Sequence, residues 1–119
     1  HKYIENGDEI YVTGDYNRLK QVIINLVKNS KEAIKDKGEI VLEGKRIKNR
    51  FVIRIEDNGI GMSEEELSRV KDMFYTTKEK GSGIGVCLSN EIIEAHGGIM
   101  NYKSKVGKGT TVVIELPIK

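Results

Sequence analysis

The spacing of hydrophobic residues changes repeatedly along this chain, between the two-residue period of strands and the 3.6-residue period of helices. Strand-like segments are residues 9–13, 39–47, 51–57, 99–105 and 110–116. Helical spacing predicts one helix from Asp15 to about Lys35, a short one after Ser63, and one from Ser82 to His96. We therefore expect an α+β fold, a two-layer sandwich. Its mixed, mostly antiparallel sheet should carry about three helices on one face.

Two helix starts and one buried helix face can be specified further. Asp15 is a suitable N-cap for the first helix, and Ser63 with Glu66 has the spacing of a capping box. Along the last helix, the residues expected to face the core are Ile84, Leu88, Ile92 and Ala95.

The composition is that of one globular domain, residues 1–119, with 38% hydrophobic and 32% charged residues. A net charge of +2, without a basic patch interleaved with aromatic residues, argues against nucleic acid as a partner. No apolar run approaches the roughly 20 residues of a membrane span, and the single cysteine, Cys87, fits a reducing compartment. We expect a cytoplasmic domain without direct membrane contact. Its abrupt start suggests a piece of a longer protein, and whether that protein is membrane-anchored stays open.

Two asparagines lie in the middle of the first predicted helix, where asparagine is disfavoured. Asn25 and Asn29 are four residues apart, so both point to one side of the helix. They fit two interpretations. One is an ordinary solvated face, and the other is a pair of neutral oxygen ligands for a hard cation such as Mg²⁺.

The strand at residues 51–57 ends in a carboxylate on its hydrophobic side. Alternation places Asp57 on the same side as Ile53 and Ile55. A buried carboxylate needs hydrogen-bond donors, and Gly59 and Gly61 allow a tight turn directly after it. The sequence fits either a plain turn at a strand end or a carboxylate that accepts from an amino group such as that of adenine.

A glycine-rich segment, GSGIG at residues 81–85, opens the last helix. Backbone N–H groups at a helix N-terminus favour phosphate, although a flexible loop is the simpler interpretation. The segment is not a P-loop, because no Gly-Lys-Ser/Thr follows it. Residues 72–83 lack a hydrophobic period and are expected to form a mobile loop, on which Lys78 could reach a terminal phosphate.

Four of these segments resemble, in order, the boxes of the GHKL superfamily of ATP-binding domains. NLVKN at 25–29 is similar to the N box, DNGIG at 57–61 to the first glycine box, FYTTK at 74–78 to the F box, and GSGIG at 81–85 to the second glycine box. Within the superfamily the chain looks most like sensor histidine kinases of the nitrogen-regulatory and sporulation type. The resemblance implies a Bergerat-type ATP-binding fold, with ATP and Mg²⁺ as cofactors.

The resemblance also implies a role for each matching residue. Asn29 would coordinate Mg²⁺ with Asn25 beside it, and Asp57 would accept the adenine amino group, helped by a water that Thr110 also holds. Phe74 would anchor an ATP lid running from about Met62 to Ser82. The residues implied to contact the nucleotide are Asn25, Asn29, Asp57, Gly59, Ile60, Gly61, Met62, Phe74, Thr76, Thr77, Lys78, Gly81, Ser82, Gly83, Ile84, Gly85 and Thr110. Those implied to act in the transfer itself are Asn25, Asn29 and Lys78.

Some positions depart from the family pattern. Glu32 and Ala33 stand where many histidine kinases carry a lysine and an aromatic residue, so nucleotide contacts there are left open. Val70 and Met73 replace the usual residues of the F box. His96 is expected to cap the last helix, where a cation is favoured. Neither histidine of the chain precedes a glutamate, as the phosphoacceptor histidine of the family does.

Several ATP-dependent activities remain as alternatives: a histidine kinase, a clamp ATPase, a serine kinase of the anti-sigma type, and a catalytically idle regulator. Clamp ATPases and anti-sigma kinases typically have a glutamate four residues before the metal-binding asparagine. This chain has Asn25 there, and an amide takes no proton at neutral pH. The sequence therefore predicts a protein-histidine kinase catalytic domain. It would pass phosphate to a histidine on a separate helical dimerisation domain, with a response regulator downstream.

Overall fold

The computed structural model describes residues 2–5, 8–11, 15–34, 37–70 and 85–118. Two short strands, β1 (Lys2–Glu5) and β2 (Asp8–Tyr11), pair with each other in antiparallel fashion. The strand predicted at 9–13 corresponds to β2, and its last two residues lie outside the described residues. Strand β1 was not predicted from the sequence.

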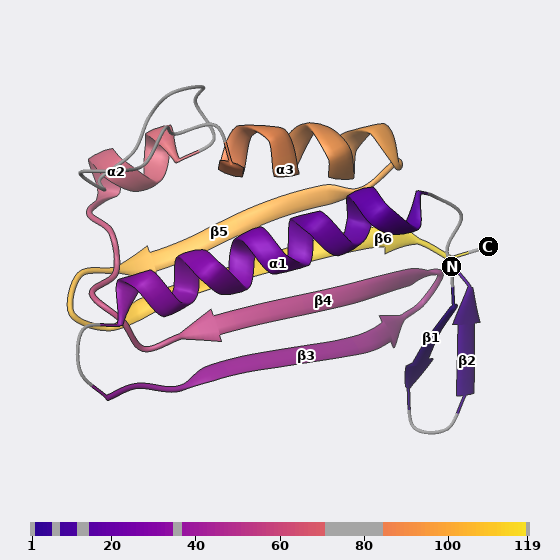
Figure 1. The fold of residues 1–119 in the computed structure, drawn as a ribbon, viewed down its shortest axis with the longest axis horizontal. Helices are drawn as coiled ribbons and strands as arrows, with labels where there is room; N and C mark the ends of the chain where they lie inside the picture. Colours follow the sequence, from indigo (N-terminus) through magenta and orange to yellow (C-terminus); the bar gives the residue numbers. More distant parts are fainter. Residues whose placement is uncertain (1, 6–7, 12–14, 35–36, 71–84, 119) are drawn as a thin grey trace.

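The main sheet has four strands in the order β3-β4-β6-β5, and every neighbouring pair is antiparallel. The strands are β3 (Ile40–Ile47), β4 (Arg50–Asp57), β5 (Ile99–Lys105) and β6 (Gly109–Pro117). All four lie within one residue of the predicted boundaries. Strands β3 and β4 form one hairpin, and strands β5 and β6 form another. The two hairpins join through β4 and β6, the second strand of each (Figure 1).

Three helices complete the described chain: α1 (Tyr16–Ala33), α2 (Glu64–Arg69) and α3 (Gly85–Ala95). The Asp15 side chain caps α1 by accepting from the Arg18 N–H at 3.1 Å. The capping box predicted for Ser63 and Glu66 is present at the start of α2. Polar side chains thus begin both helices, as the sequence predicts.

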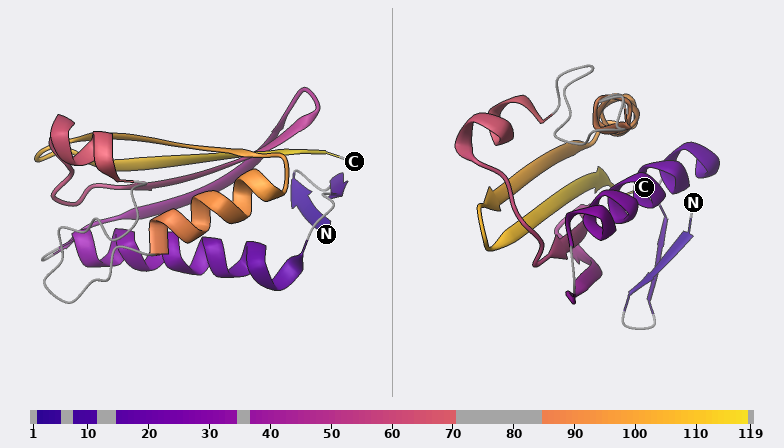
Figure 2. Two further views of the ribbon diagram at one scale, coloured as in Figure 1. Left: turned by 90° about the horizontal axis from the view of Figure 1, so that it is seen from above. Right: turned by 60° about the vertical axis from the view of Figure 1, so that its left-hand side comes forward.

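The helices and the sheet form two layers. Figure 2 shows α1 and α3 side by side on one face of the sheet, while α2 contacts β5. The predicted two-layer α+β sandwich is confirmed, but the sheet in the described part of the chain is entirely antiparallel rather than mixed. None of the described helices combines the length and the apolar character that crossing a membrane requires.

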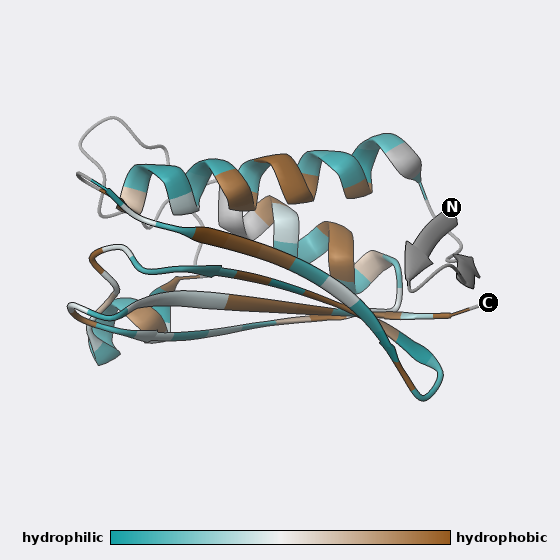
Figure 3. Cartoon of the chain, turned by 90° about the horizontal axis from the view of Figure 1, so that it is seen from below, coloured by the Kyte–Doolittle hydropathy of each residue, from teal (hydrophilic) through white to brown (hydrophobic). Residues whose placement is uncertain are grey.

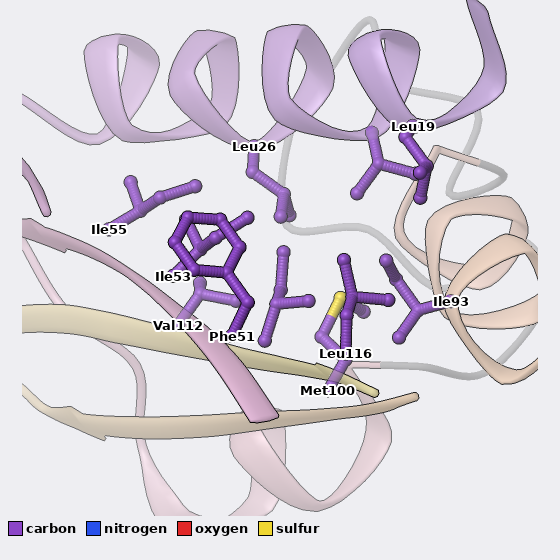
Figure 4. Close-up of a cluster of buried hydrophobic side chains, with 11 residues drawn as sticks. Leu19, Leu26, Phe51, Ile53, Ile55, Ile93, Met100, Val112 and Leu116 are labelled. Carbon is purple, nitrogen blue, oxygen red and sulfur yellow. The ribbon is translucent and has the colours of Figure 1, made fainter. Parts of the chain in front are cut away.

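The core lies between these layers (Figure 4). Its buried members are Leu19, Val22 and Leu26 of α1, Phe51, Ile53 and Ile55 of β4, Ile93 of α3, Met100 of β5, and Val112, Ile114 and Leu116 of β6. Hydrophobic and hydrophilic residues alternate along the strands. Along α1, hydrophobic residues recur about once per turn (Figure 3). Burial of these side chains is the main favourable contribution to folding, at about 25 cal/mol per Å² of apolar surface.

The face predicted for α3 is right at Ile92, which is half-buried and packs against the core, and wrong at two other positions. Leu88 is 43% exposed and Ala95 is also exposed, whereas Ile93 and Ser89 are at most 1% exposed. Ile84 lies outside the described residues. The true stripe passes through a serine, and a hydrophobic count along the sequence therefore chose the neighbouring apolar residues instead.

The opposite face of the sheet is charged. Arg54 of β4 lies between two carboxylates, Glu43 at 3.3 Å and Glu56 at 3.0 Å. All three side chains are more than one third exposed, so these ion pairs contribute little to stability. These charged side chains face solvent, and the residues of the candidate site lie elsewhere.

Candidate functional site

Asp57 is the last residue of β4, on the face of the sheet that the helices cover. Its side chain is only 5% exposed. Oδ1 accepts two backbone hydrogen bonds, from Gly59 N–H at 2.9 Å and from Thr110 N–H at 3.3 Å. No described residue donates to Oδ2. The backbone therefore fixes this carboxylate through Oδ1 and leaves Oδ2 as an acceptor for a further donor.

Two glycines let the chain turn directly after Asp57. A Cβ at Gly59 would collide with the backbone of Ala33 at the end of α1. Gly61 has a φ of 72°, and a Cβ there would collide with the Lys105 carbonyl at the end of β5. The turn is thus packed tightly between two elements, which explains why glycine stands at both positions.

Backbone hydrogen bonds hold Ile60 in the same turn. Its N–H donates to the Ala33 carbonyl at 3.0 Å, and its carbonyl accepts from Gly107 N–H at 2.9 Å. The Ile60 side chain is 49% exposed, and that of Met62 is half-buried. Ala33, one of the positions that departs from the family pattern, therefore supports the turn through its backbone.

A pair of hydroxyl groups adjoins the carboxylate. Thr110 of β6 pairs with Asp57 of β4, and Ser104 of β5 pairs with Thr110 on its other side. The two hydroxyl oxygens are 2.8 Å apart. Ser104 Oγ also accepts from Met62 N–H at 2.7 Å and donates to the Gly109 carbonyl at 2.9 Å. Asp57, Thr110 and Ser104 thus form a polar row across three strands.

Ser104 was missed by the sequence analysis. The register of the predicted hairpin around the turn at residues 107–109 would have found it, because that register pairs Ser104 with Thr110. A serine on the inner face of a strand, beside a candidate binding residue, is the pattern that indicates such a position.

The two asparagines lie on α1. Asn25 and Asn29 are half-buried and one helical turn apart, next to the buried stripe that contains Val22 and Leu26. A fully solvated face would leave both side chains exposed, so the solvated-face interpretation does not describe this flank of the helix.

These elements meet at one end of the molecule. The C-terminal end of α1, the end of β4 and the β5–β6 turn lie together at the left of Figure 1. Gly85, predicted to bind phosphate, is the first residue of α3. The predicted site residues that lie outside the described residues are Phe74, Thr76, Thr77, Lys78, Gly81, Ser82, Gly83 and Ile84.

Comparison with known proteins defines the class. The family model described as histidine kinase-, DNA gyrase B- and HSP90-like ATPase matches residues 14–119. The chain belongs to this ATPase family, and the predicted resemblance is confirmed.

The relatives narrow the class to sensor kinases. Sensor protein DegM of Bacillus sp. (strain B21-2) is 42% identical over 112 residues, which are 94% of this chain and 30% of DegM. Sporulation kinase B of Bacillus subtilis (strain 168) is 40% identical over 114 residues, 95% of this chain and 27% of that kinase. The chain therefore spans less than a third of the length of these curated relatives.

Solved structures agree with the fold. The catalytic domain of histidine kinase ThkA has a TM-score of 0.79 and 32% identity, over 89% of this chain and 70% of that one. The mycobacterial sensor histidine kinase MprB has a TM-score of 0.84 over 93% of this chain and 77% of that one, and its 23% identity supports the fold alone. The predicted class, an ATP-binding catalytic domain of the sensor histidine kinase type, is confirmed.

Proposed function

We propose that residues 1–119 bind Mg-ATP and transfer its terminal phosphate to a histidine on a separate domain of the same kinase. The observation that carries this proposal is the environment of Asp57. A buried carboxylate with one oxygen bonded twice by the backbone, and the other without a donor from the described residues, is suited to an exocyclic amino group. In an ATPase family, that group is the amino group of adenine.

The neighbouring residues would form the rest of the base site. Thr110 would hold a water beside Asp57, while Gly59, Ile60, Gly61 and Met62 would line the adenine. The turn is narrow because its glycines touch the ends of α1 and β5, so the base would enter a backbone frame that needs little rearrangement.

Mg²⁺ would be held from α1. Asn25 and Asn29 offer neutral amide oxygens one turn apart, and both are half-buried. This donor set fits an ion that takes few protein ligands and completes its shell with phosphates and water. When bound, Mg²⁺ would neutralise the charge of the phosphates. The metal role of Asn29 and the supporting role of Asn25 remain predictions.

The phosphate end of the site rests on predicted residues. Gly81, Ser82, Gly83, Ile84 and Gly85 would offer backbone amides at the start of α3. Phe74, Thr76, Thr77 and Lys78 would form the lid, with Lys78 at the terminal phosphate. Catalysis would then consist of positioning and charge stabilisation, because the incoming histidine supplies its own nucleophile.

The relatives support a proposal about partners, because they are sensor and sporulation kinases more than three times as long as the chain. We propose a helical dimerisation domain as the phosphoacceptor, and a response regulator that receives the phosphate next. We also propose that this domain lies in the cytoplasm when it is part of its parent kinase.

Radiolabelled ATP tests the transfer. The chain is mixed with the histidine-bearing domain of its parent kinase, and the products are treated with acid. We expect acid-labile label on the added domain and none on the chain. Acid-stable phosphoserine on a partner would favour an anti-sigma kinase, and rapid phosphate release without labelling would favour a clamp ATPase.

A further inference from the structure

Ser104 makes three hydrogen bonds that the proposed function does not use. Its Oγ is within bonding distance of Met62 N, the Gly109 carbonyl oxygen and Thr110 Oγ1, at 2.7, 2.9 and 2.8 Å. Ser104 is half-buried, and it has the same inward orientation as Thr110 in the row that Asp57 begins. It therefore ties the turn after Asp57 to both strands of the β5–β6 hairpin.

The direction of each hydrogen bond follows from the chemistry of the partners. A hydroxyl has one hydrogen and two acceptor lone pairs. The Gly109 carbonyl can only accept, so Ser104 gives its one hydrogen to that oxygen. Met62 N–H can only donate, so it occupies one lone pair of Ser104. The remaining bond must then run from the Thr110 hydroxyl to Ser104.

This arrangement fixes what Thr110 can offer to a ligand. Its hydrogen is engaged by Ser104, so only lone pairs of Thr110 Oγ1 remain. The Thr110 N–H is also engaged, because it donates to Asp57 Oδ1, as does the Gly59 N–H. Toward a ligand, the side chains of Asp57 and Thr110 therefore present hydrogen-bond acceptors and no donor.

We propose that Ser104 is a positioning residue that sets the hydrogen-bond polarity of the base site and thereby selects a 6-aminopurine over a 6-oxopurine. This inference rests on the proposed function. The 6-amino group of adenine donates two hydrogens into an acceptor row. The 6-oxo oxygen of hypoxanthine is an acceptor, so it would face the acceptors of Asp57 and Thr110 with no hydrogen between them. A site that leaves buried polar groups unpaired in this way rejects the ligand.

Removal of the Ser104 hydroxyl releases the Thr110 hydrogen. In Ser104→Ala, the Thr110 hydroxyl can rotate and donate to a 6-oxo group, directly or through water. The distinguishing effect is thus on the ratio of affinities for two ligands. A role confined to stability would weaken binding of both ligands alike.

Calorimetric titration of the 119-residue chain with ADP and with IDP, both with Mg²⁺, tests the inference. The unmodified chain should prefer ADP. Ser104→Ala should lower the ADP-to-IDP affinity ratio about 3- to 10-fold, the size of one neutral hydrogen bond. Ser104→Thr keeps the hydroxyl on a strand that tolerates β-branched residues, so its ADP-to-IDP affinity ratio should equal that of the unmodified chain.

A second pair of variants tests whether Ser104 acts through Thr110. In a Thr110→Val background, Ser104→Ala should leave the ratio unchanged, because no threonine hydrogen remains to be oriented. If Ser104→Ala does not fold, Ser104→Cys keeps a similar volume with a much weaker donor and acceptor, and it should lower the ratio likewise.

The outcomes separate the inference from the function on which it rests. A chain that prefers ADP, with a ratio that neither Ser104→Ala nor Ser104→Cys changes, overturns the role of Ser104 and leaves the nucleotide site standing. Equal binding of ADP and IDP by the unmodified chain overturns the inference and also the assignment of Asp57 to the adenine amino group, while nucleotide binding itself stands. Binding of neither nucleotide overturns the proposed function as well.

Discussion

Three polar side chains of this domain, Asp57, Ser104 and His96, are fixed mainly by backbone groups. Asp57 is bonded by the N–H groups of Gly59 and Thr110, and Ser104 by Met62 and Gly109. His96 follows the same pattern: Asp15 N–H donates to its Nε2 at 2.9 Å, and its Nδ1 lies 2.7 Å from the Ile92 carbonyl. Backbone partners cannot change rotamer, so each side chain is held in one orientation.

His96 joins the end of α3 to the start of α1, and we expect its replacement to loosen that junction. Its Nδ1 donates to the Ile92 carbonyl in the last turn of α3, so the capping role predicted from the sequence is confirmed. His96→Ala leaves the Asp15 N–H without its acceptor and should lower the free energy of unfolding by about 1–2 kcal/mol. Urea denaturation measures this. An unchanged midpoint would show that the link contributes nothing.

Tyr102 gives the stability a defined pH dependence. Its hydroxyl is buried without a partner among the described residues. Burial raises the pKa of Tyr102 above its ordinary value of 10.0. Above that pH the unfolded chain loses the proton while the folded chain retains it, so the free energy of unfolding should fall as the pH rises beyond about 10.

Tyr102→Phe is the matched control for this prediction. It removes the titrating group and a buried hydroxyl that no described residue bonds, while it keeps the ring, so it should be at least as stable at neutral pH. Denaturation between pH 8 and 11 should show a steeper loss for the unmodified chain than for the variant. Parallel curves would contradict the account of Tyr102.

At the scale of elements, the β5–β6 turn determines the geometry of the polar row. Gly107 and Gly109 both have positive φ, 79° and 118°, but they differ in the space around a Cβ. A Cβ at Gly109 would collide with the carbonyl of Asp57, whereas one at Gly107 would meet nothing within 4 Å. The second glycine therefore allows β6 to approach the end of β4.

This difference predicts unequal effects of two similar substitutions. Gly107→Ala should cost about 1 kcal/mol of unfolding free energy, from its left-handed backbone alone. Gly109→Ala adds a steric clash beside Asp57, so it should cost more than 2 kcal/mol and also weaken ATP binding. Thermal denaturation with and without ATP compares the two. Equal losses would mean that the close approach of the strands is unimportant.

The elements themselves were largely predictable from the sequence, since local patterns define them. Alternation located β3 to β6, and Asp15 and Ser63 located two helix starts. The strand order, the buried serine on α3 and the hydrogen bonds of Ser104 were not predicted, because they depend on contacts between segments distant in the chain. The inward orientation of Asp57 was predicted because a carboxylate on the apolar face of a strand can be recognised from the sequence of that strand alone.

At the scale of the whole molecule, the chain corresponds to only part of the length of its relatives. It spans less than a third of its curated relatives, and we propose that the phosphoacceptor histidine lies in the parent kinase outside this domain. Asn25 offers no base to a water, and a placed base typically contributes 10²–10⁴-fold to such a step. The chain by itself should therefore hold ATP with little hydrolysis. Phosphate release at several turnovers per minute would contradict this.

Binding of ATP through Asp57 is the claim on which the account depends most, and calorimetry tests it most directly. Asp57→Asn can keep the two backbone hydrogen bonds at its carbonyl but replaces Oδ2 with a donor that faces the adenine amino group. Glu56→Gln, on the opposite face of the same strand, is the control. With Mg²⁺ present, we expect Asp57→Asn to lose about 2 kcal/mol or more, at least tenfold in affinity, while the control is unchanged. Equal affinity of Asp57→Asn and the unmodified chain would contradict the account.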